Sequence, residues 1–232
     1  MKVVGVIPAR GRSTGIPNKN LRMLLGHPLI HYITKAALGA GTLSDVYVST
    51  DSPAIAAQAT ADGASVILHP AELSVDNAPT FGVIRNALAH LEQMNVFPDV
   101  IVTMRATSPL CESRDIDSAV ELLRQRPDAG AVISVGPSAA HPWRILRITS
   151  DGWLKHYGHS TEDKYPAQRQ SFESVYVRNG AVYASRAEII RDGGLWGGCT
   201  LPYVMSWERS VNINEEIDFL LAEMLLGKRN LP

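Results

Sequence analysis

The most chemically suggestive stretch of this sequence is residues 7–20, Ile-Pro-Ala-Arg-Gly-Arg-Ser-Thr-Gly-Ile-Pro-Asn-Lys-Asn, which directly follows an apolar run. It combines three cationic residues with two glycines: Arg10, Arg12, Lys19, Gly11 and Gly15. Glycine lets a backbone approach a ligand closely, and exposed N–H groups beside cationic side chains bind anionic oxygen atoms. We therefore predict a polyphosphate site here, with a basic, turn-rich surface loop as the alternative.

The stretch matches neither of two common phosphate-binding patterns, since it lacks a closing Gly-Lys-Ser/Thr and the spacing Gly-x-Gly-x-x-Gly. It resembles instead the signature of the acylneuraminate cytidylyltransferases (CMP-sialic acid synthetases), Ile-Pro-Ala-Arg-Gly-Gly-Ser-Lys-Gly-Ile/Leu-Pro-x-Lys-Asn. Arg12 stands where that family has glycine, and Thr14 stands where it has lysine. We hypothesise that Arg12 supplies the charge that Thr14 lacks.

Three later segments resemble the same family in the family's order. Residues 105–110 look like its Gln-Pro-Thr-Ser-Pro-Leu segment, with Arg105 in place of the glutamine that contacts the acidic sugar. Residues 168–183 are similar to its Arg-Gln and Asn-Gly-Ala-Ile-Tyr stretches. Residues 210–218 resemble its Asp-Ile-Asp-Thr-x-x-Asp ending, in which two aspartates hold magnesium; here both are asparagine, Asn212 and Asn214.

The resemblance implies an enzyme that transfers CMP from CTP to an acidic sugar of the sialic or legionaminic type, a 3-deoxy-2-ulosonic acid, and releases pyrophosphate. Arg10, Arg12 and Lys19 are expected to act in catalysis. The nucleotide is expected to contact Ala9, Arg10, Gly11, Ser13, Lys19, Asn20, His69 and Asp76. The sugar is expected to contact Arg105, Thr107, Ser108, Gln168, Arg169, Gln170, Asn179 and Gly180.

Several of these residues have structural alternatives. Arg105 can clasp a carboxylate, phosphate or phosphonate with a bidentate fork, or it can form a surface ion pair. The turn at Thr107 and Ser108 can cap the following helix as readily as contact a ligand. Asn179-Gly180 by itself favours a hairpin turn.

Magnesium, or manganese in its place, is the cofactor that the resemblance implies, and Asn212, Asn214 and Asp218 are its candidate ligands. Magnesium prefers anionic oxygen atoms, whereas an amide carbonyl offers only a dipole. The metal is therefore expected on the phosphates of the nucleotide with the asparagines placing waters, or on another carboxylate such as Asp218.

The elements that must position these residues alternate between strands and helices. Strands are expected at residues 3–7, 45–51, 65–69, 100–104, 129–135, 175–183 and 210–214. Helices are expected from residue 29, from Pro53 to Gly63, after Thr80, from Ser113 or Asp115, and over 215–226 with Ile217, Leu220, Leu221 and Leu225 inward. This pattern predicts a three-layer, Rossmann-like α/β nucleotidyltransferase fold with a mostly parallel sheet, whose loops share one edge.

The composition fits one domain over residues 1–232, with a β-rich excursion at 137–175 that the resemblance assigns to dimerisation and sugar binding. A net charge of −1 without charge blocks gives no reason to expect nucleic acid or an anionic membrane as a partner. The two cysteines form no framework and are expected to be buried. With no leader or membrane span apparent, we expect a cytoplasmic homodimer.

Two other functions stay open. The departures from the family at Thr14, Arg105, Asn212 and Asn214 also suit a different acidic acceptor, such as a phosphonate or a shorter ulosonate. The chain could also be a non-catalytic nucleotide-binding homologue. A dinucleotide-dependent oxidoreductase is disfavoured, because the first loop lacks the glycine spacing of that class.

Overall fold

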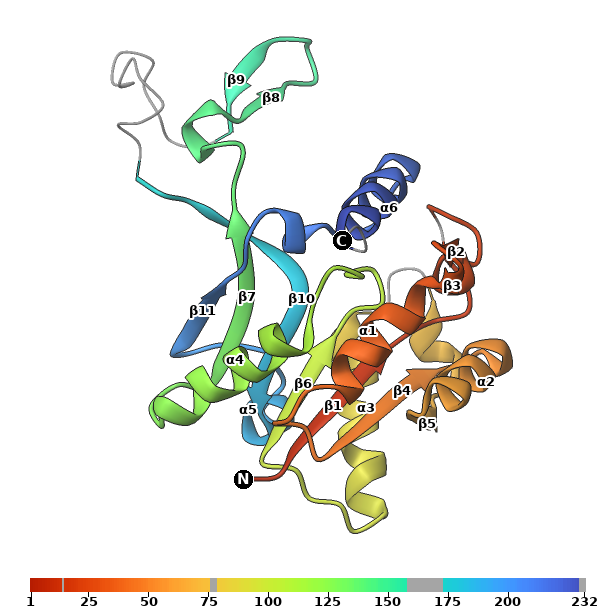
Figure 1. Ribbon diagram of the computed structural model, residues 1–232. Helices are drawn as coiled ribbons and strands as arrows, with labels where there is room; N and C mark the ends of the chain where they lie inside the picture. The colour runs from red at the N-terminus through yellow and green to blue at the C-terminus, as the bar shows by residue number, and fades with distance from the viewer. Residues whose placement is uncertain (14, 76–78, 158–172, 230–232) are drawn as a thin grey trace.

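A computed structural model describes residues 1–13, 15–75, 79–157 and 173–229. Its centre is a seven-stranded sheet with the order β11-β7-β10-β6-β1-β4-β5 (Figure 1). The strands are β1 Val3–Pro8, β4 Asp45–Thr50, β5 Ser65–Leu68, β6 Val100–Met104, β7 Ala131–Pro137, β10 Tyr176–Arg186 and β11 Thr200–Val204. Neighbouring strands are parallel except β10, which is antiparallel to both β6 and β7. The predicted mostly parallel α/β fold is confirmed.

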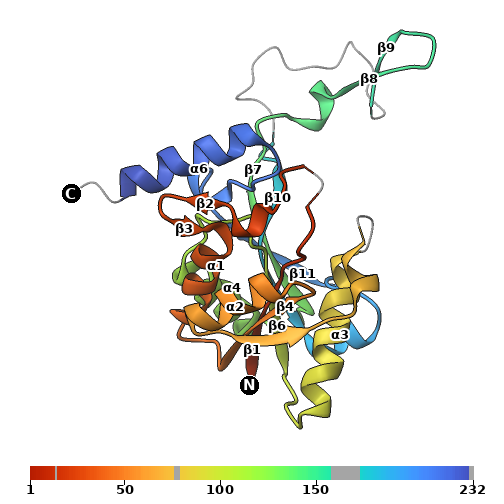
Figure 2. The same ribbon diagram turned by 90° about the vertical axis from the view of Figure 1, so that its right-hand side faces the viewer.

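Helices cover both faces of the sheet, which makes three layers (Figures 1 and 2). One layer consists of α1 Leu29–Leu38, α2 Pro53–Asp62 and α4 Ser113–Gln125, and the other of α3 Thr80–Gln93 and α5 Ala187–Arg191. Apolar side chains of both layers pack on the sheet in two separate clusters. The central strands β1 and β6 are buried on both sides, which is why they read as continuous apolar runs.

Helix α2 begins and ends where the sequence predicts. The Ser52 hydroxyl accepts a hydrogen bond from the N–H of Ile55, Pro53 occupies the first turn, and Gly63 ends the helix with φ 102°. Helix α4 differs from the prediction, because Glu112 caps it. The Glu112 side chain and the Asp115 side chain form a reciprocal capping box.

The Asn179-Gly180 pair lies inside β10, so the predicted hairpin turn is wrong. The pairing of β10 with β7 shifts register between Arg178 and Tyr183. Gly180 has φ 78°, which a bulged strand accommodates at a glycine. The bulge bends the strand beside the carboxyl end of β6.

The excursion contains η3 Pro142–Arg144 and a short hairpin of β8 Leu146–Ile148 and β9 Leu154–His156. Figures 1 and 2 show this hairpin standing clear of the body of the protein, above the edge at which the parallel strands end. Its apolar side chains are exposed, with Ile148 at 76% and Trp153 at 67%. The predicted β-rich excursion is therefore present, and residues 158–172 lie outside the described part of the chain.

The carboxyl-terminal segment corrects two predictions. Residues 210–214 form no strand: η6 Glu208–Ser210 leads into an extended segment whose Ile213 N–H donates to the Thr107 carbonyl over 2.8 Å. Helix α6 spans Glu216–Arg229 and buries Phe219, Ala222 and Leu226, whereas Ile217 and Leu220 are 66% and 61% exposed. The predicted inward face of this helix was wrong for these two residues.

Smaller elements complete the chain. After the first loop come η1 Lys19–Leu21, β2 Met23–Leu24 and β3 His27–Pro28, and η2 Ala71–Ser74 follows β5. Cys111 is buried as predicted, but Cys199 is exposed because it lies in the loop before β11. Within the described ranges, no helix has both the length and the apolar character that crossing a bilayer requires.

Candidate active site

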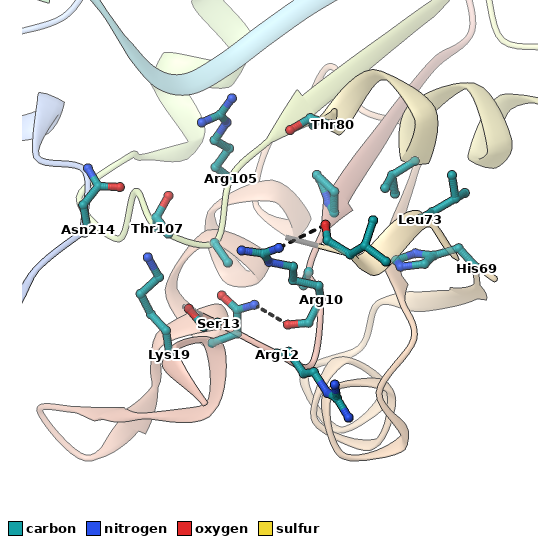
Figure 3. A pocket seen from close by; sticks show the side chains of 16 residues that line it. Arg10, Arg12, Ser13, Lys19, His69, Leu73, Thr80, Arg105, Thr107 and Asn214 are labelled. Atoms are coloured by element: carbon teal, nitrogen blue, oxygen red, sulfur yellow. Dashed lines mark hydrogen bonds between the residues drawn. The ribbon is translucent and has the colours of Figure 1, made fainter. Parts of the chain in front are cut away.

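A cavity of about 290 Å³ opens at the carboxyl edge of the parallel strands, and we call it the loop cavity (Figure 3). It is lined by Pro8, Ala9, Arg10, Arg12, Ser13, Lys19, Asn20, His69, Leu73, Val75, Thr80, Val83, Arg105, Ala106, Thr107 and Asn214. These residues come from the first loop, the ends of β5 and β6, the start of α3 and the segment before α6. The predicted convergence of distant loops at one edge is confirmed for them.

The first loop is tied to the end of β4. The N–H of Ala9 donates to the Ser49 carbonyl over 2.9 Å, and the N–H of Gly11 donates to Oδ1 of Asp51 over 2.7 Å. A Cβ on Gly11 would lie 2.9 Å from Cβ of Ser52. Gly11 is not among the residues that line the cavity, and its small size serves close packing against Ser52.

The partly buried Asp51 and the buried His69 form a polar support beneath the loop. The two ring nitrogens of His69 lie 2.8 Å from the hydroxyls of Ser49 and Ser74. Burial lowers the pKa of His69, and the charge of Asp51 offsets only part of that effect. Burial raises the pKa of Asp51, but hydrogen bonds from Gly11 and Ser74 outweigh burial and leave this pKa below its ordinary value. His69 lines the cavity with both nitrogens already engaged.

Lys19 joins the first loop to the carboxyl-terminal segment. Its Nζ donates to the Ile213 carbonyl over 2.9 Å, and a Cβ on Gly15 would meet the Asn214 carbonyl oxygen at 3.0 Å. Burial and the positive charge of Arg10 lower the pKa of Lys19, while Asp218 acts in the opposite direction. A polyanion in the cavity would favour the charged ammonium.

The cationic side chains of the cavity point in different directions (Figure 3). Arg10 lies in the centre, where Nη1 donates to the Val75 carbonyl over 3.3 Å and its own carbonyl accepts from Nδ2 of Asn20 over 3.0 Å. The guanidinium of Arg12 is exposed at the rim and points away from Arg10. Arg10 and Lys19 are thus the cations best placed for a bound anion.

Arg105 separates the loop cavity from a second hollow of about 210 Å³, which we call the Arg105 hollow. The hollow is lined by Arg105, Val177, Arg178, Asn179, Gly180, Tyr183 and Asn212. The Arg105 guanidinium lies 6.0 Å from the centre of the Tyr183 ring. No ion pair of Arg105 is present in the described part of the chain, so the surface-ion-pair alternative has no support there.

Asn179 is 5% exposed, and its amide is occupied by protein contacts. Oδ1 accepts from the Ser134 hydroxyl over 2.5 Å, and Nδ2 donates to the Ser210 hydroxyl over 3.0 Å. The geometry therefore makes Asn179 a positioning residue that joins β7, the β10 bulge and the segment leading to Asn212.

The Thr107-Ser108 turn does not cap α4, since Glu112 does so. Thr107 lines the loop cavity, and its carbonyl holds the Ile213 N–H. The Ser108 hydroxyl is buried, has no hydrogen-bond partner among the residues that the structure describes, and is not part of the cavity lining. These two adjacent residues thus differ, because Thr107 faces the cavity whereas Ser108 is buried in the protein.

The candidate metal ligands do not form a magnesium cage. Oδ2 of Asp218 accepts from the N–H groups of Asn214 and Glu215, both over 2.9 Å, so this carboxylate caps the start of α6. Asn212 lines the Arg105 hollow, but its Oδ1 is itself buried and has no hydrogen-bond partner among the described residues, whereas Asn214 lines the loop cavity. Within the described ranges no group of three Asp, Glu, His or Cys residues suits a metal ion. These residues do not fit a protein-held divalent cation.

Five residues singled out in the sequence lie outside the described residues: Thr14, Asp76, Gln168, Arg169 and Gln170. Conversely, sequence reasoning missed Thr80 and Val83 of α3, which line the loop cavity, and Arg178 of the Arg105 hollow. In the sequence Thr80 and Val83 look like the start and the apolar side of a helix, so only the folded structure shows that they line the cavity. Arg178 had a signal, because it directly precedes Asn179.

Comparison with known proteins gives one consistent result. Residues 4–206 match the cytidylyltransferase family. The chain is 33% identical to N-acylneuraminate cytidylyltransferase of Escherichia coli over 99% of this chain and 53% of that protein. It is 32% identical to CMP-N,N'-diacetyllegionaminic acid synthase of Legionella pneumophila over 97% of each. It therefore spans about half the length of the first of these relatives and nearly all of the second.

The fold has a counterpart among solved structures. CMP:2-keto-3-deoxy-manno-octonic acid synthetase complexed with CTP superposes with a TM-score of 0.74 at 16% identity, over 99% of this chain and 100% of that one. A 4-diphosphocytidyl-2C-methyl-D-erythritol synthase of Anaerococcus prevotii gives a TM-score of 0.64 at 12% identity. At these identities the likeness concerns the fold.

Proposed function

This chain belongs to the cytidylyltransferase family, and we propose that it transfers CMP from CTP to the anomeric oxygen of a 3-deoxy-2-ulosonic acid of the sialic or legionaminic type. The observation that carries the proposal is the loop cavity, in which the family's first-loop residues Arg10, Ser13 and Lys19 line one space with Arg105 and Thr107. Because the donor CTP is a cytoplasmic metabolite, the proposal places the protein in that compartment.

The triphosphate would lie along the first loop. Arg10 at the centre and Lys19 at the wall supply the charges that phosphate oxygens need, and Ser13 adds a hydroxyl. Asn20 would contact the nucleoside while holding the Arg10 carbonyl. Since Ala9 and Gly11 are anchored to β4, these groups keep their positions without a ligand and are preorganised for binding.

The acceptor would enter from the Arg105 hollow. In a 3-deoxy-2-ulosonic acid, the anomeric carbon bears both the carboxylate and the reacting hydroxyl. A cation at the border of the two spaces can therefore hold the carboxylate and orient the hydroxyl. Arg105 occupies that border, with its stem against Gly180 and its guanidinium over Tyr183. Its planar fork suits a carboxylate.

The reaction is an in-line substitution. The anomeric oxygen bonds to the α-phosphorus as its proton is lost, and the bond from the α-phosphorus to the bridging oxygen breaks, so that pyrophosphate leaves. Negative charge builds up on the leaving group, and Arg10 and Lys19 stabilise it from fixed positions. Orientation of the two substrates in adjoining spaces supplies the rest of the catalysis. Because the described candidate ligands do not fit a protein-held cation, magnesium would arrive bound to the triphosphate.

Arg105 also keeps a second acceptor class open. Its guanidinium would bind a phosphonate or a shorter ulosonate as well as a sialic-type carboxylate, because each presents paired anionic oxygens. The size of the hollow, about 210 Å³, limits how much of a nine-carbon chain lies inside it. The acceptor's distal part would then extend along Arg178 and Val177.

We propose a two-fold dimer in which the excursion at residues 137–175 of each subunit reaches the partner, with residues 141–147 closest to its acceptor site. Support comes from the projecting hairpin, whose exposed Ile148, Trp153 and Leu154 have no apolar cover within the described part of the subunit. A surface of this kind is typical of an interface.

The test is pyrophosphate release from CTP with a panel of acceptors: N-acetylneuraminate, a legionaminic acid, a shorter ulosonate and a phosphonate. Release with the first two, abolished in Arg10→Ala, supports the proposal. Release only with a phosphonate or a shorter ulosonate would reassign the acceptor. Tight CTP binding with no release on any acceptor would instead show a non-catalytic nucleotide-binding protein.

A further inference from the structure

The capping box at the start of α4 also holds the carboxyl-terminal part of the chain. Within the box the Glu112 side chain accepts from the N–H of Asp115, and the Asp115 side chain accepts from the N–H of Glu112. These two hydrogen bonds satisfy the helix start by themselves. Both carboxylates nevertheless form ion pairs with arginines from far later in the chain, Asp115 with Arg209 and Glu112 with Arg229.

The first of these contacts is made by a buried carboxylate. Asp115 is fully buried, and its Oδ1 accepts from the Tyr203 hydroxyl over 2.9 Å. The same oxygen lies 3.3 Å from Nε of Arg209, a distance that makes an ion pair although the geometry does not make a hydrogen bond. Tyr203 belongs to β11 and Arg209 to η6. Asp115 therefore joins both elements to the first turn of α4.

The second contact is made by the last residue of α6. Nη1 of Arg229 lies 2.8 Å from Oε1 of Glu112 and donates to the Leu110 carbonyl over 3.2 Å. The side chains of Arg229 and Glu112 are 32% and 31% exposed, so water screens this ion pair only in part. Movement of α6 away from α4 would break both contacts.

Residues 211–215 lie between the two anchored arginines, and we call them the wall segment. Asn214 lines the loop cavity and Asn212 lines the Arg105 hollow. Between them, Ile213 donates its N–H to the Thr107 carbonyl over 2.8 Å and accepts from Nζ of Lys19 over 2.9 Å. Two such hydrogen bonds alone are a weak tether, because each replaces a hydrogen bond to water at little net gain in free energy.

We infer that Asp115 and Glu112 are positioning residues for the active site. They act through Arg209 and Arg229, which hold the wall segment from its two ends. The inference rests on the proposed function, because it takes CTP and an acidic acceptor as the ligands. Burying the Asp115 charge costs free energy that its partners offset, so this ion pair serves to fix one arrangement of the chain. Without these contacts the wall segment would lose its place beside both cavities.

Hydrogen exchange followed by mass spectrometry tests this positioning without any substrate. The double variant Arg209→Gln/Arg229→Gln removes the charge at both ends of the wall segment. We expect amide exchange in residues 211–215 to become about tenfold faster or more, while β4 exchanges as in the unaltered protein. An unchanged rate in residues 211–215, or an equal rise in β4, would overturn the inference. If the double variant unfolds, Arg209→Gln alone is compared in the same way.

The matched control is Arg124→Gln/Arg126→Gln. It removes two arginine charges from exposed ion pairs at the other end of α4, with Glu121 and Asp128. Exposed ion pairs contribute little, so exchange in the wall segment and in β4 should stay the same. Faster exchange of the wall segment in this control would show that loss of positive charge alone loosens it, which would overturn the inference.

Kinetics links the wall segment to catalysis. In Arg209→Gln/Arg229→Gln the KM for the acceptor and the Kd of CTP should each rise about tenfold, ~1.4 kcal/mol, because the segment lines both cavities. A protein that is only less stable would lose turnover with its folded fraction and keep both constants. Arg209→Lys keeps the charge beside Asp115 and should stay within about threefold of the unaltered protein, less than ~0.7 kcal/mol.

The two measurements separate this inference from the proposed function. Unchanged KM and Kd in a double variant whose wall segment exchanges faster would overturn the inference and leave the proposed function standing. No pyrophosphate release by the unaltered protein on any acceptor would overturn the proposed function. The exchange experiment would then still decide whether the capping box of α4 holds the wall segment.

Discussion

The carboxylate of Asp51 holds the backbone N–H of Gly11 at 2.7 Å and so fixes the first loop against β4. We expect Asp51→Asn to lower the free energy of unfolding by about 2 kcal/mol, because a charge-assisted hydrogen bond becomes neutral. The melting temperature should fall by roughly 4–8 °C in a thermal scan, and the affinity for CTP should fall as well.

The control for this variant is Asp45→Asn. Asp45 lies at the start of β4, the strand that Asp51 follows; it is exposed, and Nζ of Lys2 lies 4.0 Å from its Oδ2. It should change the melting temperature by less than about 2 °C, since an exposed ion pair contributes little. Equal effects of the two variants would show that the loop does not depend on Asp51.

Gly180 lies against Arg105, and an added Cβ would meet Cδ of Arg105 at 3.3 Å. Gly180→Ala should therefore displace the guanidinium and raise the KM for the acceptor by about tenfold, ~1.4 kcal/mol, with little change in the Kd of CTP. Steady-state kinetics measures the KM for the acceptor, and calorimetry measures the Kd of CTP. Gly152→Ala has a similar positive φ of 86° but no neighbour within 4 Å, so it should leave the acceptor KM unchanged.

Lys19 gives CTP binding a pH dependence. Its pKa is lowered by burial and by Arg10, and bound phosphates raise it again. At alkaline pH binding should therefore take up a proton, and the affinity should fall as the pH rises through the pKa of the unliganded protein. Calorimetry in two buffers with different ionisation enthalpies measures this uptake. Lys19→Arg should abolish it, and uptake that persists in this variant would assign the proton to another group.

His69 links stability to pH in the acidic range. Its pKa in the folded protein is lowered from 6.5 by burial, so the unfolded chain binds a proton that the folded chain does not. The stability due to neutral His69 is present above about pH 6.5 and is lost as the pH falls below it. The melting temperature should decline from there, well before Asp51 titrates, and His69→Gln should flatten this part of the profile. An unchanged slope in the variant would contradict the assignment.

The proposed dimer is tested on the β8–β9 hairpin. Ile148→Asp places a charge on an exposed apolar residue of this hairpin, and light scattering at micromolar concentration should then report a monomer. Ile217→Asp makes the same change on α6, at a residue 66% exposed, and should leave the dimer intact. A monomeric unaltered protein would contradict the dimer itself.

The sequence predicted the strands and helices of the α/β core well. A strand buried on both faces is a continuous apolar run, and a helix packed on the sheet has apolar residues at helical spacing. The first loop and the end of β6 were also placed correctly, since the carboxyl ends of parallel strands share one edge. Asn179-Gly180 was misread because a bulge inside a strand and a hairpin turn use the same residues.

Other errors came from tertiary contacts that no local pattern records. Helix α6 carries apolar residues on nearly all sides, so its sequence does not indicate which side is buried. In the structure Phe219, Ala222 and Leu226 pack in one apolar cluster, and the Arg22 guanidinium lies 4.4 Å from the centre of the Phe219 ring. Residues 210–214 alternate like a strand, yet they join no strand of the described sheet, and the Ile213 N–H donates to the Thr107 carbonyl in a loop instead. The sequence did not show that Asp218 caps α6, because a carboxylate at this position fits a metal ligand as well as a helix cap.

The hydrogen bond from Lys19 to the Ile213 carbonyl has a consequence for biosynthesis, because its two partners are 194 positions apart. While the protein is being translated, the opening strand and its loop leave the ribosome long before the segment that completes the wall beside them. The nascent chain therefore carries an unfinished site with Lys19 still hydrated, and the site becomes competent only after residues beyond 213 have emerged and docked.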